Sequence, residues 1–176
     1  MKKLLAFAGS NSKTSINKQL VTYTSSLVED AEITLLDLND FPLPVFGVDL
    51  QEEQGIPDNA KRFLEYIKAS DGIFLSLAEH NGAYSTVFKN LFDWMSRIEG
   101  ELWQHKPMLL MATSPGARGG ASVLDMAKTR FPFNGGNVVA SFSLPKFKEH
   151  FSSGRITDEA LRQSLENAVA IFKDAL

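Results

Sequence analysis

The apolar residues of this chain follow two alternating patterns. Short runs are almost wholly apolar, as in strands whose two faces are both covered. Between these runs, apolar side chains recur every three or four positions, which is the spacing of an amphipathic helix. Five strands are predicted, at residues 3–8, 33–36, 72–77, 107–112 and 138–142. A helix is predicted after each strand, with apolar stripes at residues 16–27, 60–67, 87–95, 121–129 and 161–172.

Residues that favour helix starts stand before three of these stripes. Ser15 is suited to the N-cap of the first helix, and Pro57 to the first turn of the second. We expect the last helix to begin near Thr157, because Asp158 and Glu159 would then lie at the positive end of its dipole.

The order of these elements indicates one domain over residues 1–176. Five alternations of strand and helix are typical of an open α/β sheet with helices on both faces. We therefore expect a flavodoxin-like, doubly wound, five-stranded parallel sheet in the order 2-1-3-4-5. Residues 37–55 show neither pattern, so we expect a long irregular loop there. Ligands of such sheets bind beyond the carboxyl ends of the strands, where the loops after strands one, three and four would meet.

The composition excludes several functional classes. A net charge of −3 gives no general basic surface for nucleic acid or a membrane. The chain has no cysteine, which excludes disulfides and thiolate chemistry and fits a cytoplasmic location. The apolar run at residues 4–8 is too short for a signal peptide, and no segment approaches the roughly 20 apolar residues of a membrane span.

The first loop, residues 9–17, is rich in hydroxyl groups and leads into a helix. It lacks both the G-x-G-x-x-G and the P-loop pattern, so a dinucleotide or a nucleoside triphosphate is not its natural ligand. Hydroxyls and free N–H groups at a helix N-terminus suit a phosphate monoester. The alternative is that small polar residues merely turn the chain and Ser15 caps the helix. The sequence leaves both interpretations open.

The second loop, residues 78–84, places polar groups directly after a very apolar strand. Glu79, His80 and Asn81 offer donors and acceptors for a planar heterocycle, and Gly82 permits a close approach of the backbone. The alternative for His80 is a solvated loop histidine. A metal site is not expected, because the three histidines of the chain include no pair at ligand spacing.

The third loop, residues 114–120, holds three glycines. Its free N–H groups and the positive end of the following helix suit the pyrimidine edge of a flavin and would stabilise the anion of the reduced ring. The alternative is a plain strand-to-helix turn.

Two other enzyme or signalling classes are disfavoured. A serine hydrolase would carry the nucleophile elbow G-x-S-x-G, which is absent, and neither Ser10 nor Ser114 has an evident base. A phosphoryl-accepting receiver domain needs carboxylates at the end of strand one, where this chain has Gly9 and Ser10.

Taken in order, the loops resemble the NADPH-dependent FMN reductase family, which includes flavin, quinone, azo-dye and chromate reductases. The resemblance covers about residues 3–142 and includes a proline-bearing loop at residues 43–50. The family segment G-S-x-R-x-x-S-x-N is matched at Gly9, Ser10, Ser15 and Asn17. Its P-E-Y-N-G-S-Y and K-N-x-x-D-W segments are matched at Glu79, Asn81, Gly82, Tyr84, Lys89, Asn90, Asp93 and Trp94. Its S-x-G-x-x-G-G segment is matched at Ser114, Gly116, Gly119 and Gly120.

The resemblance implies a flavoenzyme in which NADPH or NADH reduces FMN by hydride transfer. The reduced flavin would then reduce a small acceptor, namely a quinone, a flavin, an azo compound or a metal oxyanion. FMN phosphate would contact Ser10, Ser12, Ser15, Ile16 and Asn17. The flavin ring would lie against Ala78, Glu79, His80, Asn81, Gly82, Ser114, Gly116 and Gly119.

The resemblance also implies a homodimer or a homotetramer built from dimers. In the family, the helix corresponding to residues 85–97 helps to form the subunit contact, and the loop near residues 43–50 can approach the partner's site. Phe88 and Trp94 are therefore candidates for interface aromatics, and equally for core residues.

Two departures from the family pattern bear on FMN affinity and substrate choice. Ser12 stands where the family has arginine. This replacement removes a charge-assisted hydrogen bond to phosphate worth about 1–3 kcal/mol. The adjacent Lys13 is a less directional replacement. His80 stands where the family has tyrosine and adds a group for a hypothetical proton relay. Two alternatives to a reductase stay open: a flavin-binding electron carrier, and a flavodoxin-like protein that has lost FMN.

Overall fold

The computed structural model describes residues 1–176 and is built on one five-stranded parallel sheet. The strand order is β2-β1-β3-β6-β7, which confirms the predicted order 2-1-3-4-5 and the flavodoxin-like fold. The strands are β1 (Lys2–Gly9), β2 (Ala31–Leu36), β3 (Gly72–Leu77), β6 (Pro107–Thr113) and β7 (Asn137–Leu144).

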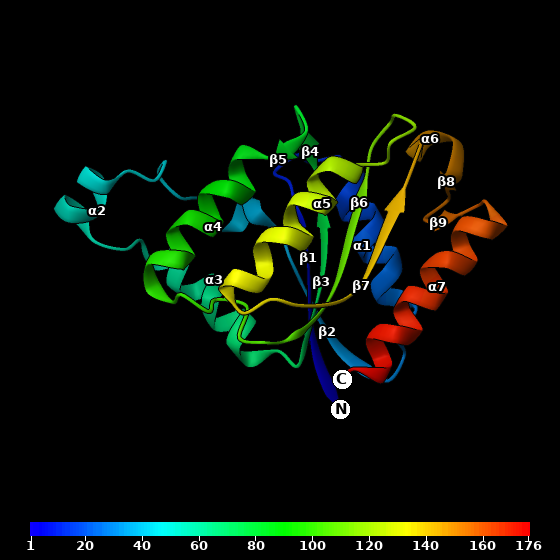
Figure 1. The fold of residues 1–176 in the computed structure, drawn as a ribbon, viewed down its shortest axis with the longest axis horizontal. Helices are drawn as coiled ribbons and strands as arrows, with labels where there is room; N and C mark the ends of the chain where they lie inside the picture. The colour runs from blue at the N-terminus through cyan, green and yellow to red at the C-terminus, as the bar shows by residue number, and fades with distance from the viewer.

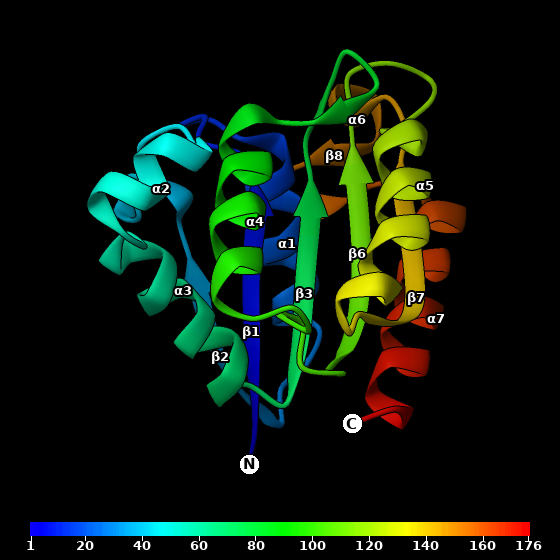
Figure 2. The same cartoon turned by 60° about the vertical axis from the view of Figure 1, so that its left-hand side comes forward.

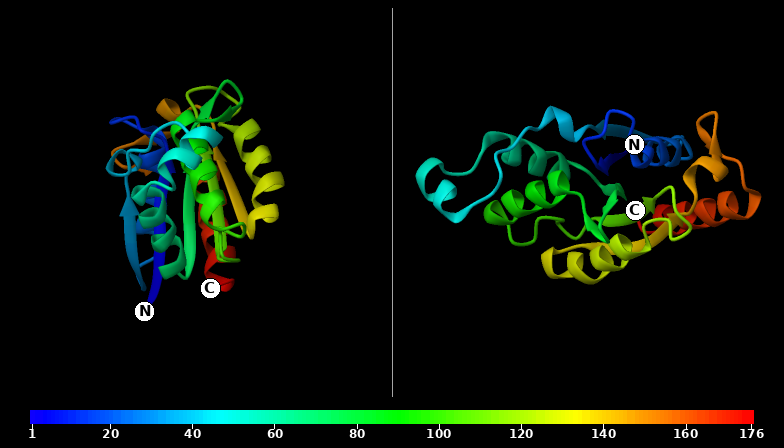
Figure 3. Two further views of the ribbon diagram at one scale, coloured as in Figure 1. Left: turned by 90° about the vertical axis from the view of Figure 1, so that its left-hand side faces the viewer. Right: turned by 90° about the horizontal axis from the view of Figure 1, so that it is seen from above.

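Helices cover both faces of this sheet (Figure 1). The five predicted helices are present as α1 (Ile16–Ser26), α3 (Asp58–Ala69), α4 (Thr86–Ile98), α5 (Ala121–Arg130) and α7 (Glu159–Asp174). The buried side chains of α3, α4 and α5 pack in one core cluster, and those of α1 and α7 pack in a second cluster on the other side of the sheet (Figure 3).

The strands explain why the apolar runs are continuous. Successive side chains of a strand point to opposite faces. In β1, Leu5 and Phe7 belong to the first cluster, whereas Leu4 and Ala6 belong to the second. All six residues of β3 are buried, because this strand lies in the middle of the sheet. Both faces of such a strand lie in a core, so residues on both faces are apolar.

The expectation of an irregular loop at residues 37–55 is wrong in two places. A 3-10 helix occupies Leu38–Asp40, and α2 occupies Val48–Gln54. Helix α2 has no buried residue, so its sequence carries no apolar stripe that periodicity could detect. It lies at the far end of an arm that extends away from the sheet (Figures 1 and 3).

Two side chains of α4 hold the base of this arm. The Asn90 side chain accepts a hydrogen bond from the Phe46 N–H at 2.8 Å and donates to the Pro44 carbonyl at 2.9 Å. The indole Nε1 of Trp94 donates to the same carbonyl at 2.8 Å, and the Trp94 and Phe46 rings meet edge to face. Asn90 and Trp94, which match the family segment K-N-x-x-D-W, thus attach the base of the arm to α4.

A second unpredicted excursion follows β7. It contains the short helix α6 (Phe147–His150) and a hairpin of β8 (Phe151–Ser152) and β9 (Arg155–Ile156). Phe151 stacks on Phe147, with ring centroids 4.6 Å apart, and meets Tyr23 of α1 edge to face. The excursion therefore packs beside α1.

The loops that follow β1, β3 and β6 lie together at one end of the sheet, and both termini lie at the opposite end (Figure 2). This arrangement follows from parallel strands, whose carboxyl ends all point the same way. No helix is long and apolar enough to span a membrane.

Candidate functional site

Asn17 connects the elements at this end of the sheet. Its amide is only 3% exposed. The side-chain Oδ1 accepts hydrogen bonds from the Ser76 hydroxyl at 2.8 Å and the Thr113 N–H at 3.0 Å, and Nδ2 donates to the Thr113 carbonyl at 3.3 Å. One buried side chain therefore joins the start of α1 to the carboxyl ends of β3 and β6.

The serine hydroxyl oxygens of the first loop accept hydrogen bonds from nearby backbone N–H groups, and these bonds fix the shape of the loop. Ser15 is the N-cap of α1, and its Oγ accepts from the Lys18 N–H at 3.1 Å. Ser10 Oγ accepts from the Ser12 N–H at 3.1 Å, and Ser12 Oγ accepts from the Thr14 N–H at 3.3 Å. These contacts use the serines as acceptors, which leaves their hydroxyl hydrogens for other partners.

Two main-chain donors stand free beside these hydroxyls. The N–H groups of Ile16 and Asn17 make no hydrogen bond within the chain, as is usual in the first turn of a helix. They lie at the positive end of the α1 dipole. Donors of this kind, without a competing carboxylate of the loop, suit an anion.

Only one lysine of this region is free to add charge. Lys18 forms an ion pair with Asp37 at 2.5 Å, and this hydrogen bond holds the pKa of the Asp37 carboxyl below its usual value. Lys13 is exposed and makes no ion pair or hydrogen bond within the chain. With Thr14 and Ser15 it lines one end of a hollow of about 420 Å³ that runs along α1.

The second loop is a small hairpin of β4 (Glu79–His80) and β5 (Ala83–Tyr84). Asn81 and Gly82 form its turn with φ angles of 52° and 77°, the left-handed pair that a type I′ turn requires. The Asn-Gly pair is itself a signal for a two-residue hairpin turn. His80, Asn81 and Gly82 are exposed at the tip, whereas Ala78 is buried at the base.

Ser85 connects this hairpin to the first loop. It is the N-cap of α4, where its Oγ accepts from the Phe88 N–H at 3.3 Å. The same hydroxyl donates to the carbonyl of Gly9 at 2.7 Å. Gly9 is the last residue of β1, so this hydrogen bond fixes the beginning of α4 next to the start of the first loop.

The glycines of the third loop are required by close packing. Gly120 has a φ of 78°, and a Cβ built there would lie 2.7 Å from the Cβ of Ala112. Gly119 has a φ of 57°, and its Cβ would lie 2.8 Å from the Pro145 nitrogen. Both positions therefore require glycine because of the backbone conformation and the packing of the chain itself, whether or not a ligand is bound. Gly119 is buried, whereas Gly116 is exposed.

The third loop is fastened to the chain after β7. The carbonyls of Ser114 and Gly116 accept hydrogen bonds from the N–H groups of Phe147 and Lys146, at 3.0 and 2.9 Å. The hairpin is fastened to the third loop's helix as well, because Glu79 Oε2 accepts from the Val123 N–H of α5 at 2.9 Å. The structure thus brings all three predicted loops into one connected assembly.

Two aromatic residues left open by the sequence belong to the core of the protomer. Phe88 and Trp94 are both fully buried within a single chain. Tyr84 lies beside Phe88, with ring centroids 5.2 Å apart, and its hydroxyl is buried without a hydrogen-bond partner. Burial raises the pKa of Tyr84 to about 12, so this phenol is neutral at physiological pH.

Several residues that shape the site were missed by sequence reasoning. Ser76 and Thr113 lie inside apolar runs, where nothing in the sequence marks their partner. Ser85 carries the usual signal of an N-cap before an apolar stripe, although its bond to Gly9 is not visible from that signal.

Comparisons with known proteins agree on one family. The model of the NADPH-dependent FMN reductase family matches residues 2–149. The quinone reductase of Escherichia coli (strain K12) is 31% identical over 90 residues, 49% of this chain and 48% of that protein. The NAD(P)H-dependent FMN reductase of Pseudomonas aeruginosa is 27% identical over 171 residues, 93% of this chain and 89% of that protein. The match to the E. coli protein therefore spans about half of that relative's length.

A solved structure is similar over the whole chain. FerB, a flavoenzyme NAD(P)H:(acceptor) oxidoreductase from Paracoccus denitrificans, superposes with a TM-score of 0.78 at 29% sequence identity. The similarity covers 99% of this chain and 97% of that chain.

We expect Asn17→Ala to destabilise the protein strongly. The substitution leaves the Ser76 hydroxyl and the Thr113 N–H buried without an acceptor, which costs about 2–4 kcal/mol. Urea unfolding followed by circular dichroism measures this loss. Asn167→Ala on the exposed side of α7 is the control and should change the free energy of unfolding by less than about 0.5 kcal/mol. Equal stability of the two variants would show that Asn17 does not join these elements.

Proposed function

The chain belongs to the NADPH-dependent FMN reductase family, and on that premise we propose that residues 1–176 form one FMN-binding unit that reduces a small acceptor with NADPH or NADH. FMN and a reduced nicotinamide nucleotide are the cofactors of this family. The observation that carries the proposal is the assembly of the three loops around Asn17, Glu79 and Ser85 at the carboxyl edge of the sheet.

The donors of the first loop fit the phosphate of FMN. A phosphate monoester presents only acceptor oxygens at its charged end, and the loop presents the hydroxyls of Ser10, Ser12 and Ser15 and the free N–H groups of Ile16 and Asn17. We propose that these groups hold the phosphate. Since the Asn17 amide already has internal partners, its contribution to this contact is mainly its backbone N–H.

We propose that the remaining predicted residues surround the flavin ring. We propose that Ala78, His80, Asn81 and Gly82 lie on the hairpin side of the ring. Ser114, Gly116 and Gly119 would lie on the side of the third loop, and Glu79 between the two. FMN, when bound, supplies the hydride-transfer chemistry, so the chain needs no nucleophile of its own. Exposed His80 is the one titratable side chain at the hairpin tip, and we propose that it delivers protons.

A quinone or a flavin is the favoured acceptor. The relatives above are named quinone reductase and FMN reductase, and FerB is named for an unspecified acceptor. Azo compounds and metal oxyanions are further acceptors of the same class. We place the enzyme in the cytoplasm.

Two other functions use the same fold. A flavin-binding electron carrier would take electrons from a partner protein, for which a strongly acidic docking face is expected, and the net charge of this chain is only −3. A protein that has lost FMN is favoured only by Ser12 in place of the family arginine.

We expect the purified protein to be yellow from flavin absorption, or to become so when FMN is added. Addition of NADPH without oxygen should bleach this absorption, and addition of a quinone should restore it, because the flavin passes between its two states. Protein that stays colourless with added FMN would contradict the proposal. Bound FMN that NADPH fails to reduce without a partner protein would favour the electron carrier.

Ser12→Arg should tighten FMN binding about tenfold, which corresponds to about 1.4 kcal/mol. Arginine adds a charge-assisted hydrogen bond at a position that lies beside the free donors of α1. Quenching of FMN fluorescence by apoprotein measures the dissociation constant. Ser164→Arg on the exposed side of α7 adds the same charge elsewhere and should leave the constant unchanged. Equal affinities of the two variants would place the phosphate outside the first loop.

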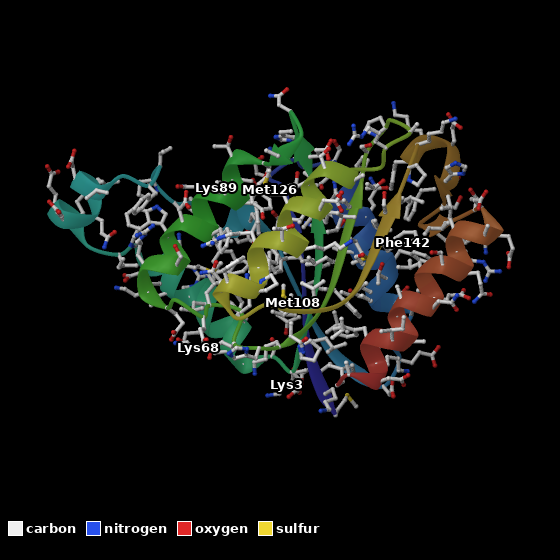
Figure 4. All side chains as sticks on the ribbon, viewed as in Figure 1. Lys3, Lys68, Lys89, Met108, Met126 and Phe142 are labelled. Atoms are coloured by element: carbon white, nitrogen blue, oxygen red, sulfur yellow. The ribbon has the colours of Figure 1, made fainter.

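We further propose a homodimer, or a homotetramer of dimers, in which α4 takes part in the contact. A hollow of about 370 Å³ lies between α4 and α5. Lys89 and Met126, which Figure 4 labels, are among the residues that line it. Asn134 also lines it, and its Oδ1 atom is buried without a hydrogen-bond donor. A subunit that docks here would cover the exposed Met126.

Light scattering should therefore give twice or four times the mass of one chain. Met126→Glu should lower the mass or shift the equilibrium toward the monomer, because a charge would be buried at the contact. Ile171→Glu is the matched control, since Ile171 is an exposed apolar residue on α7 at the other face of the sheet. A monomeric wild-type protein would contradict this assembly.

A further inference from the structure

Helix α5 begins without a cap of its own. Its N-cap is Gly120, which offers no side chain, and its first turn contains no acidic residue. The first N–H groups of a helix have no partner within it, and they concentrate the positive end of the helix dipole. In the surrounding sequence, Arg118 adds a further positive charge and donates only to Ser122.

Glu79 supplies the missing acceptor from a distant part of the chain. Its Oε2 atom accepts from the Val123 N–H in the first turn of α5 at 2.9 Å. This is the position that an N-cap side chain normally serves. Of the carboxylates of the chain, only Glu79 bonds to this turn. The contact therefore gives a free N–H group of the first turn an acceptor and places a negative charge at the positive end of the helix dipole.

The place of Glu79 in the hairpin gives this contact a second consequence. Glu79 lies in β4 directly after the base of the hairpin and is paired with Tyr84 of β5. Tyr84 leads into Ser85, which is bonded to Gly9 at the first loop. A displacement of Glu79 would therefore shift the hairpin relative to both neighbouring loops.

The carboxylate is half-buried, so its charge is less screened than that of a surface residue. Because its Oε2 atom is bonded to α5, Glu79 can act on the flavin through its charge without touching the ring. A negative charge at this helix end opposes the accumulation of negative charge on a nearby ring.

We propose that Glu79 is a positioning residue that caps α5, fixes the β4–β5 hairpin against the third loop and lowers the reduction potential of the bound flavin. The part that concerns the flavin rests on the proposed function. The cap itself does not, because it is present in the protein chain alone.

The cap is tested in apoprotein by amide hydrogen exchange at Val123. Glu79→Ala removes the acceptor and should speed exchange of the Val123 N–H at least tenfold, whereas Glu79→Gln keeps an acceptor oxygen and should retain most of the protection. Equal exchange rates in wild-type protein and Glu79→Ala would overturn the cap. The result does not depend on FMN, so a failure of the proposed function leaves this measurement decisive.

The electrostatic role is tested in the FMN-bound protein. Glu79→Gln removes the charge with little change in shape, so reduced FMN should bind about tenfold more tightly relative to oxidised FMN. This tenfold change in relative affinity corresponds to a rise of about 30 mV in the two-electron reduction potential of the bound flavin. Reduction against a reference dye measures this potential. Glu79→Ala should raise the potential similarly and also weaken binding of oxidised FMN, because the hairpin loses its attachment.

Glu29→Gln is the matched control for charge. Glu29 is exposed in the turn before β2, at the opposite end of the sheet, so its neutralisation should leave the flavin potential unchanged. A potential that stays constant in Glu79→Gln, or that changes equally in Glu29→Gln, would overturn the electrostatic role. Wild-type protein that binds no FMN would instead refute the proposed function.

Discussion

The candidate site depends on the burial of one amide. Asn17 has both a donor and an acceptor in its side chain, and it uses them to bond two strands that are adjacent in the sheet but distant in the sequence. An amide in this position is expensive to bury unless it is satisfied, so its three bonds select a single arrangement of α1 relative to β3 and β6. The hydroxyls and free N–H groups of the first loop are held in place by that arrangement.

The fold was accessible from the sequence because its signals are local and repeated. The alternation of continuous apolar runs with helical stripes reflects a sheet covered on both faces, and β3 and α3 show it clearly. Helix α2 could not be predicted in this way, since it buries none of its side chains and leaves no periodic trace. The excursion from α6 to β9 is held by the aromatic contact of Phe151 with Tyr23, which is a long-range pairing.

The candidate site was only partly accessible. The three loops could be identified because polar residues and glycines follow apolar strands, and the structure places them together (Figure 2). Their individual roles depend on partners far along the chain. Gly119 and Gly120 are required by packing against Pro145 and Ala112, and Glu79 faces the backbone of α5. A residue type at a loop position indicates which bonds are available, whereas the tertiary neighbours decide which of them are used.

The arm that carries α2 makes fewer buried contacts than the helices that cover the sheet, because no residue of α2 is buried. Its helix contributes no side chain to either core cluster. At its base the arm is attached by the contacts of Asn90 and Trp94, by the Arg97 guanidinium over the Phe46 ring, and by the Asn59 side chain, which donates to the Pro42 carbonyl. The free energy needed to open such a segment is far below that of global unfolding. Local opening there exposes peptide bonds to proteases while the sheet stays intact, so the arm is the natural point for a first cleavage and for tolerated insertions.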